Sequence, residues 1–315
     1  MTDGASPTDP ELDPELAAAI SRLEADGWLP LWRDDVAAAR RSYRELALIR
    51  RGEAAAVGSV HDDVVPGQDA DVAVRVYEPP GEQRAITVVW LHGGGWVLGD
   101  LDTADGAARR VCTHLGATVV SVDYRLAPEH PHPAPVTDAH TALRWAATLR
   151  PSDRLVVGGD SAGAGLAAGA ALLARDWGPA VDAQLLLYPG LDPAMSSPSI
   201  SGNARGPFLS RADLDWFWGH YVPAPDLRED PALAPLNDPD GLHGVAPAVV
   251  ATAELDPLRD EGRAYADTLE LAGVAVRRLE GAGLVHGYFG LAAASAAARV
   301  EGDRALDALA ELLAS

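Results

Sequence analysis

The chain has 315 residues, of which 48% are hydrophobic and 23% are charged, and this balance predicts a folded globular protein with a sizeable core. Its formal net charge of −21 argues against nucleic acids and anionic membrane surfaces as partners, because both repel a negative field. All 25 basic residues are arginines, which excludes chemistry that needs a lysine amine, such as Schiff-base catalysis.

The sequence indicates a protein that is neither inserted into a membrane nor secreted. No run reaches the roughly 18 uninterrupted apolar residues that a transmembrane helix needs. The acidic N-terminus lacks the basic start and the apolar run of a secretory signal. The single cysteine, Cys112, cannot form an internal disulfide and fits a reducing compartment. We therefore expect a cytoplasmic protein.

Residues 1–57 are predicted to form two helices separated by the apolar segment WLPLW, and we expect them to act as an N-terminal helical cap segment. Strand patterns begin at Gly58 with an antiparallel pair, VHDDVV and VAVRVYEPP. The later strand candidates are ITVVWLH, ATVVSVDY, RLVVGGD, AQLLLYPG, AVVATAELD and VAVRRLEG, with helices at about 102–115, 136–149, 161–176, 259–272 and 291–313. Apolar strands that alternate with helices predict the α/β class, with a mostly parallel sheet of about eight strands and helices on both faces.

One segment interrupts this alternation. Residues 195–242 are rich in Pro, Gly and Ser, yet contain the aromatic cluster FLSRADLDWFWGHYV. An insertion between two strands of such a sheet is a typical way to place a cap over it. We therefore predict one catalytic domain, residues 58–194 and 243–315, with a cap built from residues 195–242 and the N-terminal segment.

The strongest local motif is GDSAG, which has a strand pattern before it and a helix pattern after it. This is the G-x-S-x-G pattern of a sharp turn that exposes a nucleophilic serine, here Ser161, at the edge of a sheet. The flanking glycines let strand and helix approach closely, and the start of the helix offers N–H groups to an oxyanion. A dinucleotide-binding glycine motif is the rival interpretation. It fits poorly, because Gly165 and Gly169 lie within the helix and not in the turn that opens it.

A second glycine-rich loop, HGGGW, begins at His92 and also follows a strand pattern. One strand–helix–strand unit before a nucleophile turn, such a loop directs backbone N–H groups at the carbonyl oxygen of a bound acyl group. We expect Gly93, Gly94 and Gly95 to form an oxyanion hole together with Ala162. His92 is expected to hold the loop by hydrogen bonds.

A serine hydroxyl needs a base, and a further group that orients the base. In this kind of sheet the chain order is serine, acid, histidine. Of the nine histidines, His286 alone follows the last candidate strand, in the loop before the C-terminal helix, and is the predicted base. Asp256 ends the strand pattern AVVATAELD and is the predicted acid, with Glu254 and Asp260 as near rivals.

Aromatic residues of the glycine-rich loop and of the insertion are candidates to line a substrate pocket. They are Trp96, Phe208, Trp216, Phe217, Trp218 and Tyr221, and Asp160 joins them beside the nucleophile. We expect no metal site, because His130 and His132 are separated by a proline and lack a carboxylate cage. We expect no cofactor.

The motifs HGGGW, DYRLAPEH, GDSAG, DPLRDEG and HGY follow one another in the order and spacing of a known family. From about residue 60 to the C-terminus the chain resembles the hormone-sensitive-lipase-like esterases, in their bacterial GDSAG branch. The resemblance implies an α/β-hydrolase fold and a serine carboxylesterase that acts on small, short-to-medium acyl esters. It puts Ser161, Asp256 and His286 on the catalytic triad. Because many relatives pair through the edge of the sheet, it also favours a homodimer.

Two other interpretations stay open from the residues alone. A biosynthetic acyltransferase, a lactonase or an amide hydrolase would use the same covalent chemistry on a different acceptor or substrate. A non-catalytic ligand-binding relative would share the fold, although such proteins can lose a member of the triad and here all three are present.

Overall fold

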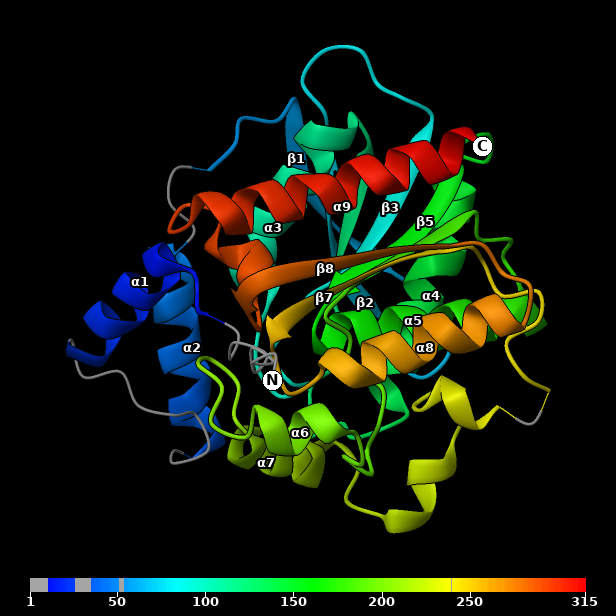
Figure 1. The fold of residues 1–315 in the computed structure, drawn as a ribbon. Helices are drawn as coiled ribbons and strands as arrows, with labels where there is room; N and C mark the ends of the chain where they lie inside the picture. The colour runs from blue at the N-terminus through cyan, green and yellow to red at the C-terminus, as the bar shows by residue number, and fades with distance from the viewer. Residues whose placement is uncertain (1–10, 26–34, 51–53, 239) are drawn as a thin grey trace, which may run out of the picture.

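The computed structural model describes residues 11–25, 35–50, 54–238 and 240–315, which form an eight-stranded sheet covered by helices (Figure 1). The strands are β1 (Ser59–Val65), β2 (Val72–Glu78), β3 (Ile86–Leu91), β4 (Thr118–Asp123), β5 (Arg154–Asp160), β6 (Ala183–Leu187), β7 (Ala248–Leu255) and β8 (Val276–Val285). Their order is β1-β2-β4-β3-β5-β6-β7-β8. Strands β3 to β8 are parallel, whereas β2 pairs antiparallel with β4 and β1 antiparallel with β2. The predicted mostly parallel sheet is confirmed.

Helices cover both faces of this sheet, because its central strands carry apolar side chains on both sides. β3 and β6 are buried at every position. α3 (Leu101–Leu115) and α9 (Ala296–Ala314) pack on one face, and α4 (Ala134–Leu149), α5 (Ala162–Trp177) and α8 (Arg259–Leu271) on the other (Figure 1). Each face encloses its own apolar core. This arrangement is the doubly covered α/β sheet that the sequence predicts.

Two further groups of helices gather near the end of the sheet where the parallel strands finish (Figure 1). α1 (Pro14–Ala25) and α2 (Val36–Arg50) match the predicted N-terminal helices, and the WLPLW segment between them lies outside the described residues. α6 (Pro198–Gly202) and α7 (Arg211–Tyr221) come from the insertion, which then continues in short 3₁₀ turns. The division of the chain into a catalytic domain and a cap stays a prediction.

The C-terminal helix begins later than the sequence predicts. We expected one helix over about 291–313, whereas the chain forms a 3₁₀ turn at Tyr288–Leu291 and α9 starts only after Ser295. Ser295 sets this start, because its hydroxyl accepts a hydrogen bond from the N–H of Ala298. The delay leaves a short segment between His286 and α9 that reaches the site described below.

Two observations concern the chain's environment. Within the described ranges, no helix combines the length and apolar character needed to cross a bilayer. Cys112 is buried in α3, and its burial raises the pKa of the thiol to about 12. The thiol is therefore protonated at neutral pH and a poor nucleophile.

Candidate active site

Ser161 occupies the tight turn between β5 and α5, at the centre of the sheet. Its backbone is strained, with φ 55° and ψ −123°. Gly159 and Gly163 make the turn possible. A Cβ on Gly159 would lie 2.3 Å from the carbonyl oxygen of Leu91, and a Cβ on Gly163 only 2.0 Å from the same oxygen. The two glycines therefore let β5 and α5 press against the end of β3.

Three side chains that are distant in the sequence meet at the carboxyl edge of the sheet. Asp256 follows β7 and His286 follows β8. The Nε2 atom of His286 lies 2.8 Å from Oγ of Ser161, and its Nδ1 atom lies 2.8 Å from Oδ2 of Asp256. Asp256 is fully buried, and its other oxygen accepts the N–H of Leu258 at 2.8 Å. This arrangement favours a proton on Nδ1 and leaves Nε2 to accept the serine proton.

The two rival carboxylates have other partners. Glu254 accepts a backbone N–H of β8 at 2.8 Å. Asp260 pairs with Arg259 at 2.8 Å. Within the described residues, the imidazole of His286 pairs with Asp256 and with neither of these two carboxylates. The structure therefore brings Asp256, and not its neighbours, to the histidine.

The loop after β3 carries N–H groups beside the serine. Gly94 and Gly95 adopt φ values of 126° and 61°, which residues with side chains rarely adopt. In the described part of the chain, the N–H groups of Gly94, Gly95 and Ala162 have no hydrogen-bond acceptor. All three residues border the cavity that opens over the serine. These three N–H groups are therefore available to an oxygen atom of a ligand.

Gly93 differs from the two glycines that follow it. Its N–H donates a hydrogen bond to Oδ1 of Asp160 at 3.1 Å. The expectation that Gly93 offers a donor to a substrate is corrected, because its N–H already has an acceptor. Burial raises the pKa of the Asp160 carboxyl to about 6, although the hydrogen bond from the Gly93 N–H opposes that rise. Asp160 thus anchors the start of the loop.

His92 packs behind the same loop, where it makes the expected hydrogen-bond contact. Its ring stacks on Tyr124 with centroids 4.3 Å apart, and its Nδ1 atom lies 2.8 Å from the carbonyl oxygen of Gly93. Burial lowers the pKa of the imidazole, which keeps it neutral. A Cβ on Gly99 would lie 2.4 Å from the same ring, so the chain must turn with a glycine there.

A cavity of about 480 Å³ opens over Ser161 and His286. Of the predicted lining residues, Trp96, Asp160, Phe208 and Phe217 border it. The lining is mainly apolar, and its polar side chains include Ser161 and His286 at one side and Arg110, Arg299 and Asp303 from α3 and α9. An apolar cavity with a few convergent polar groups is the usual form of a small-molecule site.

Trp216, Trp218 and Tyr221 were expected at this cavity and do not border it. Tyr221 stacks behind Trp96, with ring centroids 4.6 Å apart. Trp216 packs against His220 at 4.7 Å and stays half-buried. Adjacent residues of a helix point about 100° apart, so the cavity receives Phe217 and not its neighbours on either side.

The sequence did not identify the wall that comes from α2 and from the segment after the histidine. Residues of that segment, Phe289 to Leu291, border the cavity because α9 begins late. From α2 the lining residues are Tyr43, Leu46 and Ala47. Their spacing is i, i+3 and i+4, the signature of one helix face, and it could have identified them.

Comparisons with known proteins agree with this fold. The model of the alpha/beta hydrolase fold family matches residues 88–290. The chain is similar to carboxylesterase NlhH of Mycobacterium tuberculosis, with 46% identity over 76% of this chain and 78% of that protein. It is similar to esterase LipI of the same bacterium, with 38% identity over 98% of this chain and 97% of that protein.

A solved structure is similar over almost the whole chain. It is the ester hydrolase EH1AB1 from the metagenome of Lake Arreo, complexed with a derivative of bipyridine phosphonate. The two folds superpose with a TM-score of 0.89 at 36% identity, over 96% of this chain and 98% of that one.

The chain belongs to the α/β-hydrolase fold family, in its hormone-sensitive-lipase-like branch. It is a serine carboxylesterase, a hydrolase of carboxylic esters, as its relatives over most of the chain are. The acyltransferase, lactonase, amide hydrolase and non-catalytic alternatives are not favoured.

Proposed function

We propose that Ser161, His286 and Asp256 hydrolyse the ester in two steps through an acyl-enzyme. The observation that carries this proposal is the pair of 2.8 Å contacts that His286 makes, one to the serine Oγ and one to the aspartate. A hydroxyl at that distance from a neutral Nε2 can lose its proton as it attacks.

In the first step, Oγ of Ser161 attacks the ester carbonyl carbon and Nε2 of His286 takes the hydroxyl proton. The tetrahedral intermediate then collapses, and the imidazolium gives that proton to the leaving alkoxide, which departs as the alcohol. In the second step, water attacks the acyl-enzyme, His286 takes its proton, and the proton returns to Oγ as the acid is released. Asp256 stays ionised throughout, orienting the ring and stabilising the imidazolium.

We assign the oxyanion hole to the N–H groups of Gly94, Gly95 and Ala162. Their lack of a protein acceptor supports this assignment, and so does their place beside the serine. Developing negative charge on the carbonyl oxygen would meet donors that are already in position. Losing one such donor costs about 10²–10³ in rate.

We propose small, short-to-medium acyl esters as substrates. The cavity of about 480 Å³ supports this size class, and its mainly apolar lining suits an alkyl chain. A cytoplasmic location and a homodimer remain part of the proposal. The single buried cysteine is consistent with a reducing compartment, and β1 and β8 are the sheet edges through which copies could pair.

Labelling with a fluorophosphonate ester tests the assignment directly. We expect one adduct per chain, located on Ser161 by peptide mass spectrometry, and parallel loss of p-nitrophenyl ester hydrolysis. The variant Ser161→Ala should resist labelling and lose on the order of 10⁶ in kcat. An adduct on another residue, or near-normal turnover by the variant, would refute the proposed nucleophile.

A further inference from the structure

Helix α2 is attached to the rest of the protein by two arginines, which contact different segments of the chain. Arg40 reaches the turn that follows the oxyanion glycines, whereas Arg44 reaches the start of α3. The two side chains are one helical turn apart, so they share a helix face but not their partners. Variants of the two arginines can therefore distinguish an effect on the position of α2 from an effect on the position of the loop.

Arg40 makes three kinds of contact with its planar guanidinium. Nε donates to the carbonyl oxygen of Val97 at 2.8 Å, and Nη2 donates to the carbonyl oxygen of Ala127 at 3.0 Å. Nη1 and Nη2 also pair with the carboxylate of Glu129 at 2.8 and 2.7 Å. The guanidinium therefore joins two separate backbone segments, with its charge balanced by one carboxylate.

These two backbone segments support the proposed oxyanion donors. The N–H groups of Val97 and Leu98 both donate to the carbonyl oxygen of Gly94, at 3.2 and 2.9 Å. The N–H of Ala127 donates to the carbonyl oxygen of Trp96 at 2.9 Å. These hydrogen bonds close the turn from Gly94 to Leu98. A shift of Val97 would therefore also move the peptide units of Gly94 and Gly95.

The insertion also contacts the loop. The ring of Phe217 on α7 lies so close to Gly95 that a Cβ there would be 2.1 Å from it. The loop is thus contacted by Arg40 of α2 and by Phe217 of α7. Glycine has the most permissive backbone of all residues, so contacts with other parts of the protein help to fix the conformation of this loop.

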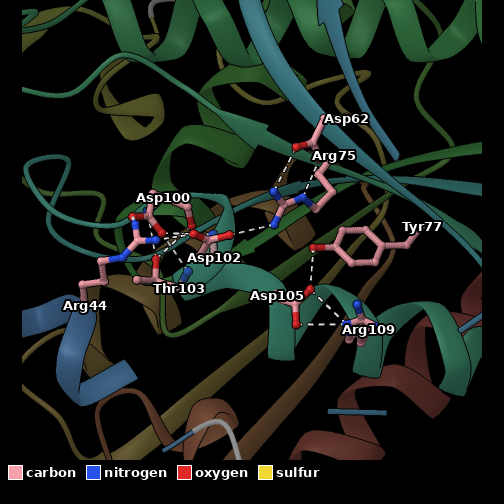
Figure 2. A network of polar contacts seen from close by, with 9 residues as sticks. All are labelled: Arg44, Asp62, Arg75, Tyr77, Asp100, Asp102, Thr103, Asp105 and Arg109. Atoms are coloured by element: carbon pink, nitrogen blue, oxygen red, sulfur yellow. Dashed lines mark hydrogen bonds and ion pairs between the residues drawn. The ribbon is translucent and has the colours of Figure 1, made fainter. Parts of the chain in front are cut away.

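Arg44 supplies the comparison that a test needs. Figure 2 shows it pairing with Asp100, the N-cap of α3, and with Asp102 in the first turn of that helix. Asp102 also pairs with Arg75 of β2 at 2.9 Å, and Arg75 pairs with Asp62 of β1 (Figure 2). This network fastens α2 to the sheet without touching the turn that starts at Gly94.

We propose that Arg40 is a positioning residue for catalysis, which holds the oxyanion loop in its active geometry through the carbonyl groups of Val97 and Ala127. The inference rests on the proposed function, because it needs Gly94 and Gly95 to be the donors. Through Arg40, helix α2 affects the rate of the reaction as well as forming a wall of the pocket.

The experiment compares Arg40→Ala and Arg40→Lys with Arg44→Ala and Glu129→Gln. Each variant is assayed for kcat and KM on a p-nitrophenyl ester, and for its turnover of the matching thionoester. Sulfur is a weaker hydrogen-bond acceptor than oxygen, so the ratio of ester to thionoester turnover reports how well the oxyanion donors are aligned. A thermal unfolding curve for every variant shows whether it is folded at the assay temperature.

We expect both Arg40 variants to lose about 10- to 50-fold in kcat, a fraction of the loss of a whole donor, with KM changed less than about threefold. The ester-to-thionoester ratio should fall by a similar factor. Lysine should not rescue, because one ammonium cannot reproduce the fork that reaches both carbonyl groups. Arg44→Ala and Glu129→Gln should stay within about threefold of wild type in kcat, because both leave the carbonyl contacts of Arg40 intact.

Three results would overturn the inference. They are equal losses in Arg40→Ala and Arg44→Ala, full rescue by lysine, and a loss of kcat with an unchanged ester-to-thionoester ratio. Each would mean that Arg40 acts only by holding the helix or by pairing with Glu129. The proposed function has its own test, since Ser161 would still be labelled and essential in all three cases.

Discussion

The two walls of the site are built in different ways. On one wall, Ser161, Asp256 and His286 each follow a strand of the buried sheet, and packing around the serine turn leaves no room for a single Cβ. On the other wall, the N–H groups of Gly94 and Gly95 belong to a glycine loop that side chains of α2 and α7 contact. We therefore infer that the core fixes the proposed reacting groups, while the outer helices align the proposed oxyanion donors of the loop and shape the pocket.

This difference predicts two kinds of variant. Changes on the core wall should abolish turnover or destabilise the fold, with little effect on which ester is preferred. Changes on the outer wall should alter rates by smaller factors and shift acyl-chain preference, because they leave the nucleophile and its base in place.

After the loss expected for Ser161→Ala, the largest effect should come from Asp256→Asn. An amide in place of the carboxylate would present an N–H to Nδ1 of His286 and favour the wrong tautomer, so kcat should fall about 10⁴-fold. Steady-state hydrolysis of a p-nitrophenyl ester measures it. The matched controls are Glu254→Gln and Asp260→Asn, which should each lose less than about tenfold. Equal losses in all three variants would remove the case for Asp256.

The next largest effect is a loss of stability in the variant Gly163→Ala, which tests the packing of the core wall. Its added Cβ would lie 2.0 Å from the carbonyl oxygen of Leu91, so β3 and α5 must separate. We expect the free energy of unfolding to drop by about 3 kcal/mol, as for an overpacked core. Gly202→Ala on α6 is the control, because its Cβ would meet nothing within 4 Å. Urea unfolding of the two variants should differ clearly, and similar curves would contradict the packing argument.

Asp160, at the boundary between the two walls, gives a pH-dependent prediction. Its pKa is raised to about 6 in the folded protein, so the folded state binds its proton more tightly than the unfolded chain. Ionising it as the pH rises from about 4 to 6 therefore destabilises the fold. Asp160→Asn should gain stability over wild type across this range, by about 3 kcal/mol at most, and the gain should stay constant above it.

Urea unfolding at several pH values measures this gain, and Glu129→Gln supplies a control of opposite sign. Arg40 lowers the pKa of Glu129 to about 2, so the stability that this carboxylate adds is present at neutral pH. It is lost as the pH falls below about 4.5. A pH-independent difference between Asp160→Asn and wild type would show that the carboxyl titrates normally.

The core wall could be predicted from the sequence because its signals are local or follow from chain order. The strand before Ser161, the two flanking glycines and the helix after it lie within one short stretch. Asp256 and His286 each end a strand pattern in the order that the fold requires. No long-range contact had to be known to select any of them.

The outer wall could not be predicted in the same way, because tertiary contacts decide it. The N–H of Gly93 meets Asp160 only because β3 and β5 are neighbours in the sheet. Arg40 contacts Val97, which lies 57 positions later in the chain. For the aromatic cluster, the composition of the insertion was informative, but the rotation of α7 about its axis decides which ring meets the cavity.

The smallest predicted effect tests that rotation with the neighbouring pair Phe217→Ala and Trp216→Ala. Phe217 borders the cavity and covers Gly95, whereas Trp216 packs against His220 away from it. We expect Phe217→Ala to lower kcat/KM for a butyrate ester about tenfold, or about 1.4 kcal/mol, and Trp216→Ala to stay within about threefold.

A series of acyl lengths separates the two roles of the phenyl ring. If the ring only limits the pocket, its removal should leave acetate turnover unchanged and favour longer chains. If it also supports the oxyanion loop, kcat should fall for every chain length, and the fall should persist in the shortest ester, which is too small to reach the vacated space. A larger loss in Trp216→Ala than in Phe217→Ala would mean that the outer wall is formed by the opposite side of α7.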